Sequence, residues 1–138
     1  SDPSGTGEIL GPKYFEEFAV AYINRLLDAL QGEKLGTIVH ICGHMSPVYN
    51  EIKEVRSSPL SFDSIVPMKE ARKHLPDRVL MGNVSTYALE FGDPARVKLL
   101  TKSCMRNGSD IIAPACGLGM KSPLPNIQAI LACVKGEA

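Results

Sequence analysis

The chain has 138 residues, 44% of them hydrophobic, and its 15 basic residues balance 15 acidic ones. This is the size of one ordinary domain with its own core, and the balanced charge argues against a role driven by electrostatic attraction to nucleic acid or a membrane surface. No apolar run approaches the roughly 20 residues that a membrane-spanning helix needs. We therefore expect a cytoplasmic protein whose cysteines are reduced.

The chain changes character at Pro12. Residues 1–11 are rich in glycine and predict a lead-in loop. From Pro12 onward apolar side chains recur at helical spacing until Gly32, so we predict a helix over residues 12–31. The face that we expect to pack on the core consists of Phe15, Phe18, Ala19, Tyr22, Ile23, Leu26, Leu27 and Leu30.

After this helix, short apolar runs alternate four times with helical patterns. Strands that alternate with helices indicate an α/β fold with a parallel sheet and right-handed crossovers. We expect residues 37–136 to form four βα units within a single domain of residues 1–138. The predicted strands cover residues 37–42, 60–63, 79–83 and 110–113. The predicted helices cover residues 46–56, 67–75, 94–107 and 125–135.

Two architectures accommodate four consecutive βα units. One is an open, doubly wound sheet, and the other is half of a (β/α)8 TIM barrel, which typically needs about 250 residues. An isolated half-barrel exposes strand edges that favour association. If the chain is half a barrel, we expect it to pair with a second half, either a homodimer partner or the missing N-terminal half of a longer protein.

The first predicted strand carries two side chains that bind metals. Side chains alternate across a strand, so His40 and Cys42 share one face while Val39 and Ile41 share the other. The apolar face suits packing under helices. A third candidate, Cys116, follows the last predicted strand in a glycine-rich loop.

Polar or metal-binding side chains stand at every predicted strand end: His40 and Cys42, then Asp63, Asn83 and Cys116. The carboxyl ends of parallel strands meet at the rim where such folds bind ligands. Two thiolates and one imidazole suit tetrahedral zinc, and three protein ligands leave a position for water or substrate, as in catalytic sites. The alternative is that the cysteines are small packing residues and the histidine is a satisfied polar group.

Several segments resemble a known family: the opening SDPSGTGEILGPKYFEEF, and HICG, LMGNVS, DIIAPACGLG and SPLPNIQAI further on. They are similar to the C-terminal part of the uroporphyrinogen decarboxylase superfamily, whose members are (β/α)8 barrels. More narrowly, they resemble its zinc-dependent branch, the methylcobalamin:coenzyme M methyltransferases. The resemblance covers essentially the whole chain but only about half of a family member.

This resemblance implies roles for the candidate residues. His40, Cys42 and Cys116 take the zinc-ligand positions. A small thiol such as coenzyme M binds the zinc as its thiolate, and its sulfur takes a methyl group from methylcobalamin or another methylated corrinoid delivered by a separate corrinoid protein. From their position at neighbouring strand ends, we expect Asp63 and Asn83 to orient the substrate or a zinc ligand; their alternative is a turn-forming aspartate and a strand-closing asparagine.

Three other functions stay open from sequence. One is a decarboxylase-type family member that acts on a tetrapyrrole without a metal. Another is a zinc- or corrinoid-docking module without turnover, and the third is a purely structural domain with cysteines in its core. For the remaining candidates we expect Cys104 and Cys133 to pack in the core, His74 to lie on the surface, and His44 to be a solvated loop residue, with a place in the pocket lining as its alternative.

Overall fold

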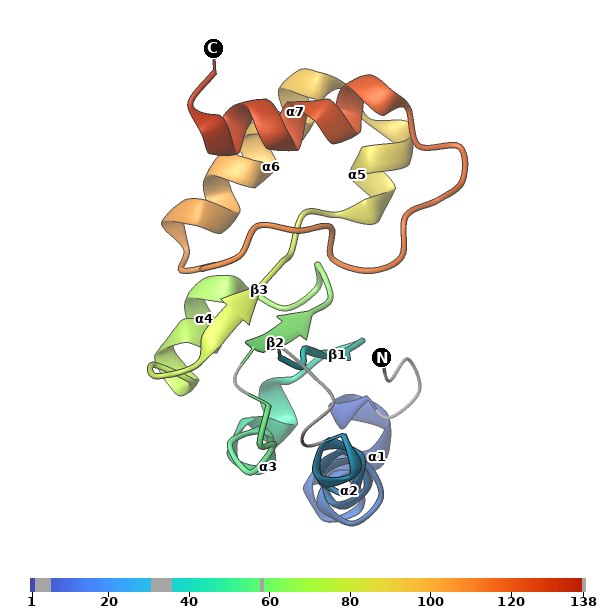
Figure 1. Cartoon of the computed structure of the whole chain (residues 1–138), viewed down its shortest axis with the longest axis vertical. Coiled ribbons are helices and arrows are strands. Elements are labelled where there is room, and N and C mark those ends of the chain that lie inside the picture. Colours follow the sequence, from blue (N-terminus) through green and yellow to red (C-terminus); the bar gives the residue numbers. More distant parts are fainter. Residues whose placement is uncertain (2–5, 31–35, 58, 138) are drawn as a thin grey trace.

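A parallel three-stranded sheet forms the middle of the molecule (Figure 1). The computed structural model describes residue 1 and residues 6–30, 36–57 and 59–137. The strands β1 (Val39–Ile41), β2 (Pro59–Phe62) and β3 (Val79–Met81) lie in the order β1-β2-β3. All pairings are parallel, which confirms the predicted α/β class.

The predicted fourth strand is reduced to an extended segment beside β3. Two isolated parallel bridges join it to the sheet, Met81 with Ile111 and Val84 with Pro114. The N–H of Gly82 donates to the carbonyl of Ile111 at 2.9 Å. Further along, the N–H of Val84 donates to the carbonyl of Ala113 at 3.0 Å, and the N–H of Ala115 donates to the carbonyl of Val84 at 2.8 Å. The segment still follows β3 in the parallel order that a barrel requires.

Helices follow each strand, and three of them gather at one end of the molecule (Figure 1). Helix α4 (Met68–His74) begins after Pro67, α6 (Pro94–Arg106) is capped by Asp93, whose side chain accepts the N–H of Arg96, and α7 (Leu124–Lys135) ends at the left-handed Gly136. All three were predicted to within about a residue. The helices are α1 (Gly7–Tyr14), a π-helical turn η1 (Phe15–Val20), α2 (Ala21–Ala29), a 3-10 turn η2 (Ser46–Val48), α3 (Tyr49–Ile52), α4 (Met68–His74), α5 (Thr86–Phe91), α6 (Pro94–Arg106) and α7 (Leu124–Lys135).

Other boundaries differ from the prediction. The expected lead-in loop is wrong from Gly7 onward, because α1 begins there and bends at Gly11, whose φ of 68° only glycine adopts readily. Residues 2–5, and the predicted helix end near residue 31, lie outside the described residues. The helix predicted over 46–56 is shorter, and α5 was not predicted, although Ser85 caps it by accepting the N–H of Ala88.

The core consists of two clusters. The larger one packs the helices against one face of the sheet, where Ile41, Leu60 and Leu80 are fully buried and Val39 packs against them. This confirms the predicted apolar face of the first strand. The smaller cluster lies between α5, α6 and α7 and consists of Val84, Leu89, Val97, Cys104, Ala129 and Ile130. Cys104 and Cys133 are buried as predicted.

The predicted core face of the N-terminal helix is only partly buried. Phe15 and Ala19 are buried and Ile23 packs against the core, but several apolar side chains of α2 and its preceding turn are exposed. Together with Ile38 they line an open groove of about 390 Å³ beside β1. On α7, likewise, Leu131 is exposed whereas Ala129 is buried. The exposed residues of the N-terminal stripe are Phe18, Tyr22, Leu26 and Leu30.

None of the helices within the described parts of the chain combines the length and apolarity that crossing a bilayer requires.

Candidate metal centre

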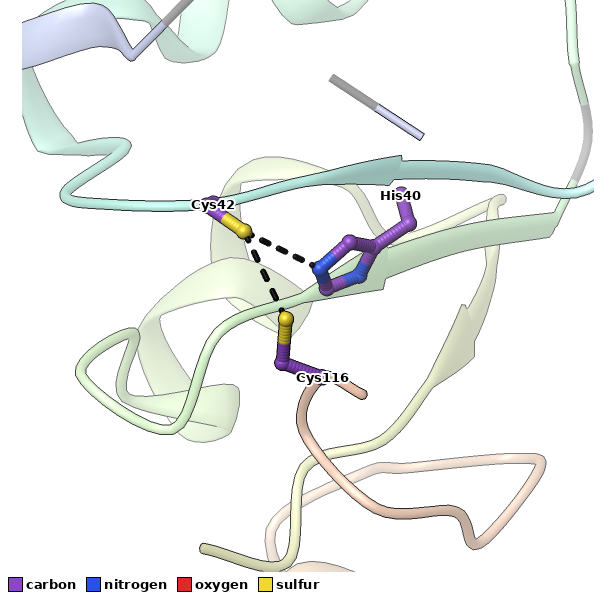
Figure 2. A group of neighbouring side chains, drawn as sticks. All are labelled: His40, Cys42 and Cys116. Carbon is purple, nitrogen blue, oxygen red and sulfur yellow. Dashed lines mark hydrogen bonds between the residues drawn. The ribbon is translucent and has the colours of Figure 1, made fainter. Parts of the chain in front are cut away.

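Three side chains from distant parts of the chain meet at the carboxyl edge of the sheet. His40 lies on β1, Cys42 directly follows this strand, and Cys116 lies in the turn after the extended segment of residues 111–114. Figure 2 shows the three side chains pointing toward one another. Their ligand atoms all lie within 4.8 Å of one another. The predicted residues are therefore brought together because parallel strands end at the same edge.

Two of the distances among these atoms are close to those around one tetrahedral zinc ion. The sulfurs of Cys42 and Cys116 are 3.7 Å apart, and Nε2 of His40 is 3.3 Å from the Cys42 sulfur. Zinc–sulfur bonds of about 2.3 Å and a zinc–nitrogen bond of about 2.0 Å at tetrahedral angles place two sulfurs about 3.8 Å apart and nitrogen about 3.5 Å from sulfur. The donor set and its spacing therefore fit a zinc ion.

The surroundings of His40 favour its neutral, metal-binding form. Burial lowers the pKa of His40, and the nearby negative charge of Asp63 offsets part of this shift. Metal ions bind the neutral imidazole, so a lowered pKa keeps a lone pair available at neutral pH. On the other side of the ring, Nδ1 lies 2.9 Å from Oγ of Ser61.

Sequence reasoning missed Ser61 as a member of the site. It occupies the β2 position paired with His40, and its side chain is 4% exposed. The sequence did contain one signal. Ser61 stands two positions before Asp63 in the predicted strand over residues 60–63, and side chains two positions apart in a strand share a face. The cross-strand register that brings Ser61 to His40 is a tertiary property.

Asp63 and Asn83 stand at strand ends as expected, and both make hydrogen bonds to the turn after β2. The Oδ1 atom of Asp63 accepts hydrogen bonds of 3.2 Å from Ser64 Oγ and the Ile65 N–H, which form the turn after β2. Asn83 is buried and donates from Nδ2 to the carbonyls of Asp63 and Val66, each at 2.8 Å. Asn83 therefore holds this turn in place. Substrate contact by either residue stays a prediction.

The other histidines lie apart from the cluster. Nε2 of His44 is 3.8 Å from a carboxylate oxygen of Glu8, and both side chains are largely solvent-accessible. His74, which was expected on the surface, is partly exposed. Its ring is partly buried because it stacks on Tyr49, with centroids 4.4 Å apart and planes 7° from parallel.

These features define a class of protein: consecutive βα units of a parallel barrel that carry a histidine–cysteine–cysteine cluster at the carboxyl rim. Residues 1–136 match the family described as uroporphyrinogen decarboxylase (URO-D). The chain belongs to the uroporphyrinogen decarboxylase family, which confirms the resemblance found in its sequence.

Within this family the chain is similar to methyltransferases of Methanosarcina species. It is 27% identical over 135 residues to the methylcobamide:CoM methyltransferase MtbA of Methanosarcina acetivorans, covering 97% of this chain and 40% of that protein. It is 29% identical to the methylcobamide:CoM methyltransferase MtaA of Methanosarcina barkeri (strain Fusaro), covering 96% of this chain and 39% of the relative.

A solved structure supports the same relationship. The fold superimposes on a methyltransferase from Methanosarcina mazei with a TM-score of 0.87 at 25% identity, covering 98% of this chain and 40% of that one. The predicted fold class, part of a (β/α)8 barrel, is thereby confirmed. The chain spans about 40% of the length of these relatives.

Proposed function

We propose that this chain forms the zinc-binding part of an enzyme that moves a methyl group from a methylated corrinoid to a small thiol such as coenzyme M. The observation that carries the proposal is the cluster of His40, Cys42 and Cys116, whose spacing suits one zinc ion. Its similarity to methylcobamide:CoM methyltransferases supports the choice of reaction.

The chemistry of the cluster suits a thiol acceptor. A bound zinc ion lowers the pKa of a coordinating thiol, so that it is a thiolate at neutral pH. His40, Cys42 and Cys116 would hold the ion and leave one position for the substrate. In the transfer, the substrate sulfur forms a bond to the methyl carbon as the cobalt–carbon bond breaks, and the bonding electron pair stays on cobalt.

Asp63 and Asn83 are the proposed substrate-orienting residues. Asp63 carries a negative charge close enough to His40 to influence its pKa. Asn83 acts through the turn of residues 63–66, which it fixes by two hydrogen bonds. Loss of Asn83 is therefore expected to displace Asp63 from the rim as well.

The rest of the barrel is the proposed macromolecular partner. Within the described residues β1 pairs with a strand on one side only, and its open edge borders the apolar groove lined by Tyr22, Leu26 and Ile38. A parallel strand and its helix, from the portion of the relatives that this chain does not span, would cover both. A corrinoid protein is the proposed donor of the methyl group.

The decisive experiment is metal analysis of the protein purified under reducing conditions, together with an assay of methylcobalamin and coenzyme M. We expect one zinc per chain, lost in His40→Ala and Cys42→Ser but retained in Cys133→Ser, which removes a buried cysteine outside the cluster. Turnover is expected once the N-terminal portion of MtbA is added to complete the barrel.

Each rival function has its own outcome in this experiment. Protein without zinc that decarboxylates a tetrapyrrole supports the decarboxylase. Stoichiometric zinc without methyl transfer by the completed barrel supports a docking module. Unchanged metal content in Cys42→Ser supports a purely structural role for the cysteines.

A further inference from the structure

The hydroxyl of Ser61 is placed by the sheet itself. Ser61 lies on β2, the central strand, which is paired with β1 on one side and β3 on the other. The register sets Ser61 opposite His40, and its Oγ lies 2.9 Å from Nδ1 of that ring. The side chain is 4% exposed, so water does not readily replace this contact.

A second buried serine shows what an ordinary structural hydroxyl does in this protein. Ser57 is 2% exposed and donates to backbone carbonyls, at 2.7 Å to Thr37 and 3.2 Å to Pro59. These bonds secure the entry to β2. Ser61 differs because its hydroxyl contacts the side chain of a candidate metal ligand.

We propose that Ser61 is a positioning residue for the metal centre, a role that rests on the proposed function. Its hydroxyl holds the imidazole of His40 so that Nε2 faces the sulfurs of Cys42 and Cys116. Nε2 already lies 3.3 Å from the Cys42 sulfur. With Nδ1 held, the ring need not rotate to receive the ion.

A hydroxyl is well suited to this role because it both donates and accepts hydrogen bonds. When a metal takes the lone pair of Nε2, the hydrogen resides on Nδ1 and Ser61 accepts it. When Nε2 carries the hydrogen and faces the Cys42 sulfur, Ser61 donates to Nδ1. The same contact therefore supports His40 with and without the ion, whereas an ionised carboxylate only accepts.

The first test is zinc affinity, measured by competition with a chromophoric chelator. Partners that orient a metal-bound histidine typically contribute 10- to 100-fold to metal affinity, and we expect a loss of about that size in Ser61→Ala. Ser57→Ala is the matched control, because it removes an equally buried hydroxyl. It is expected to lower the melting temperature and leave zinc affinity unchanged.

A pair of isosteric variants covers the case in which Ser61→Ala folds poorly. Ser61→Thr and Ser61→Val have the same shape and both suit a strand, but only threonine keeps the hydroxyl. We expect the Ser61→Thr variant to bind zinc about 10-fold more tightly than the Ser61→Val variant. Equal affinities for these two variants would overturn the proposal.

A second measurement separates this inference from the proposed function. Nitrogen-15 NMR of the metal-free protein reports the tautomer and hydrogen bonding of its three histidines, and His40→Ala assigns the relevant ring. We expect His40 to show a hydrogen-bonded Nδ1 that is lost in Ser61→Val. If no variant binds zinc, the proposed function fails while the NMR result still decides whether Ser61 holds His40; unchanged His40 signals would overturn the proposal.

Discussion

The sulfur of Cys42 lies 3.7 Å from the sulfur of Cys116, although the two residues are 74 positions apart in the chain. Cys42 directly follows β1, the first strand of the sheet, and Cys116 follows the extended segment beside β3. The contact therefore joins the two ends of the strand order. The separation is longer than a disulfide bond of about 2.05 Å. It suits two sulfurs that share a metal ion.

The same proximity predicts a response to oxidation. In metal-free protein, hydrogen peroxide is expected to join Cys42 and Cys116 in an intramolecular disulfide, each thiol giving up one hydrogen and the peroxide being reduced to two waters. The total number of free thiols should fall from four to two. Cys42 and Cys116 are consumed, whereas Cys104 and Cys133 are buried and therefore protected from the peroxide. Peptide mass mapping identifies the bond.

Zinc supplies the control for this prediction. Protein loaded with the ion should form the disulfide more slowly, since both sulfurs are then engaged, and Cys116→Ser should form none. Disulfide-linked dimers as the main product would contradict the geometry.

The buried phenol of Tyr49 should ionise late. Burial, and then the negative charge of Glu70, raise the pKa of Tyr49 to about 12. Folding therefore favours the protonated phenol, and this contribution to stability is present below pH 10 and lost as the pH rises through 12. The chain has no tryptophan, so absorbance of tyrosinate near 295 nm gives a clear titration. A late step that persists in Tyr49→Phe would show that another group causes it.

Asp110 should stabilise the sheet in a pH-dependent manner. The N–H of Leu80 donates to its Oδ2 at 2.8 Å, and this bond, followed by the guanidinium of Arg72, lowers the pKa of Asp110 below its usual value. A lowered pKa contributes stability above the unfolded-state pKa near 4, which is lost as the pH falls through the folded-state pKa.

Urea denaturation of Asp110→Asn measures this effect. The side chain is half exposed, so we expect a loss of only about 1 kcal/mol at pH 7 that shrinks toward zero in acid. Asp77→Asn, in the exposed turn before β3, should change stability by less than about 0.5 kcal/mol. A deficit in Asp110→Asn that stays constant between pH 7 and pH 3 would mean that the charge is not its cause.

The parts of the fold that the sequence predicted are those encoded locally. Asp93 and Gly136 mark helix ends through their own side chain or backbone, so α6 and α7 were located closely. Alternation along one strand predicted that His40 and Cys42 share a face. The strand ends then suggested Cys116, because parallel strands finish at a common edge.

The parts that the sequence did not predict depend on long-range packing. Ser61 joins the site through the register between β1 and β2, which no spacing motif records. The prediction that Tyr22 and Leu26 lie on a helix is confirmed, but the prediction that they are buried is wrong. An apolar stripe in the sequence shows that a helix has an apolar face. It does not show whether the elements that cover this face belong to the same 138 residues.

That exposed stripe gives the last prediction. Leu26 is 65% exposed and lines the groove beside β1, so Leu26→Asp should leave both the fold and zinc content of the chain intact. It should abolish association with the N-terminal portion of MtbA, because a buried carboxylate without a partner is costly at an apolar interface.

Leu99 on α6 provides the matched control for Leu26, since it is 61% exposed and lies outside the groove. Leu99→Asp should associate as the unchanged chain does, as measured by analytical ultracentrifugation. If the chain alone forms a dimer that Leu26→Asp dissociates, the groove is covered by a second copy. If Leu26→Asp and the unchanged chain bind the MtbA portion equally well, the groove is not the surface that completes the barrel.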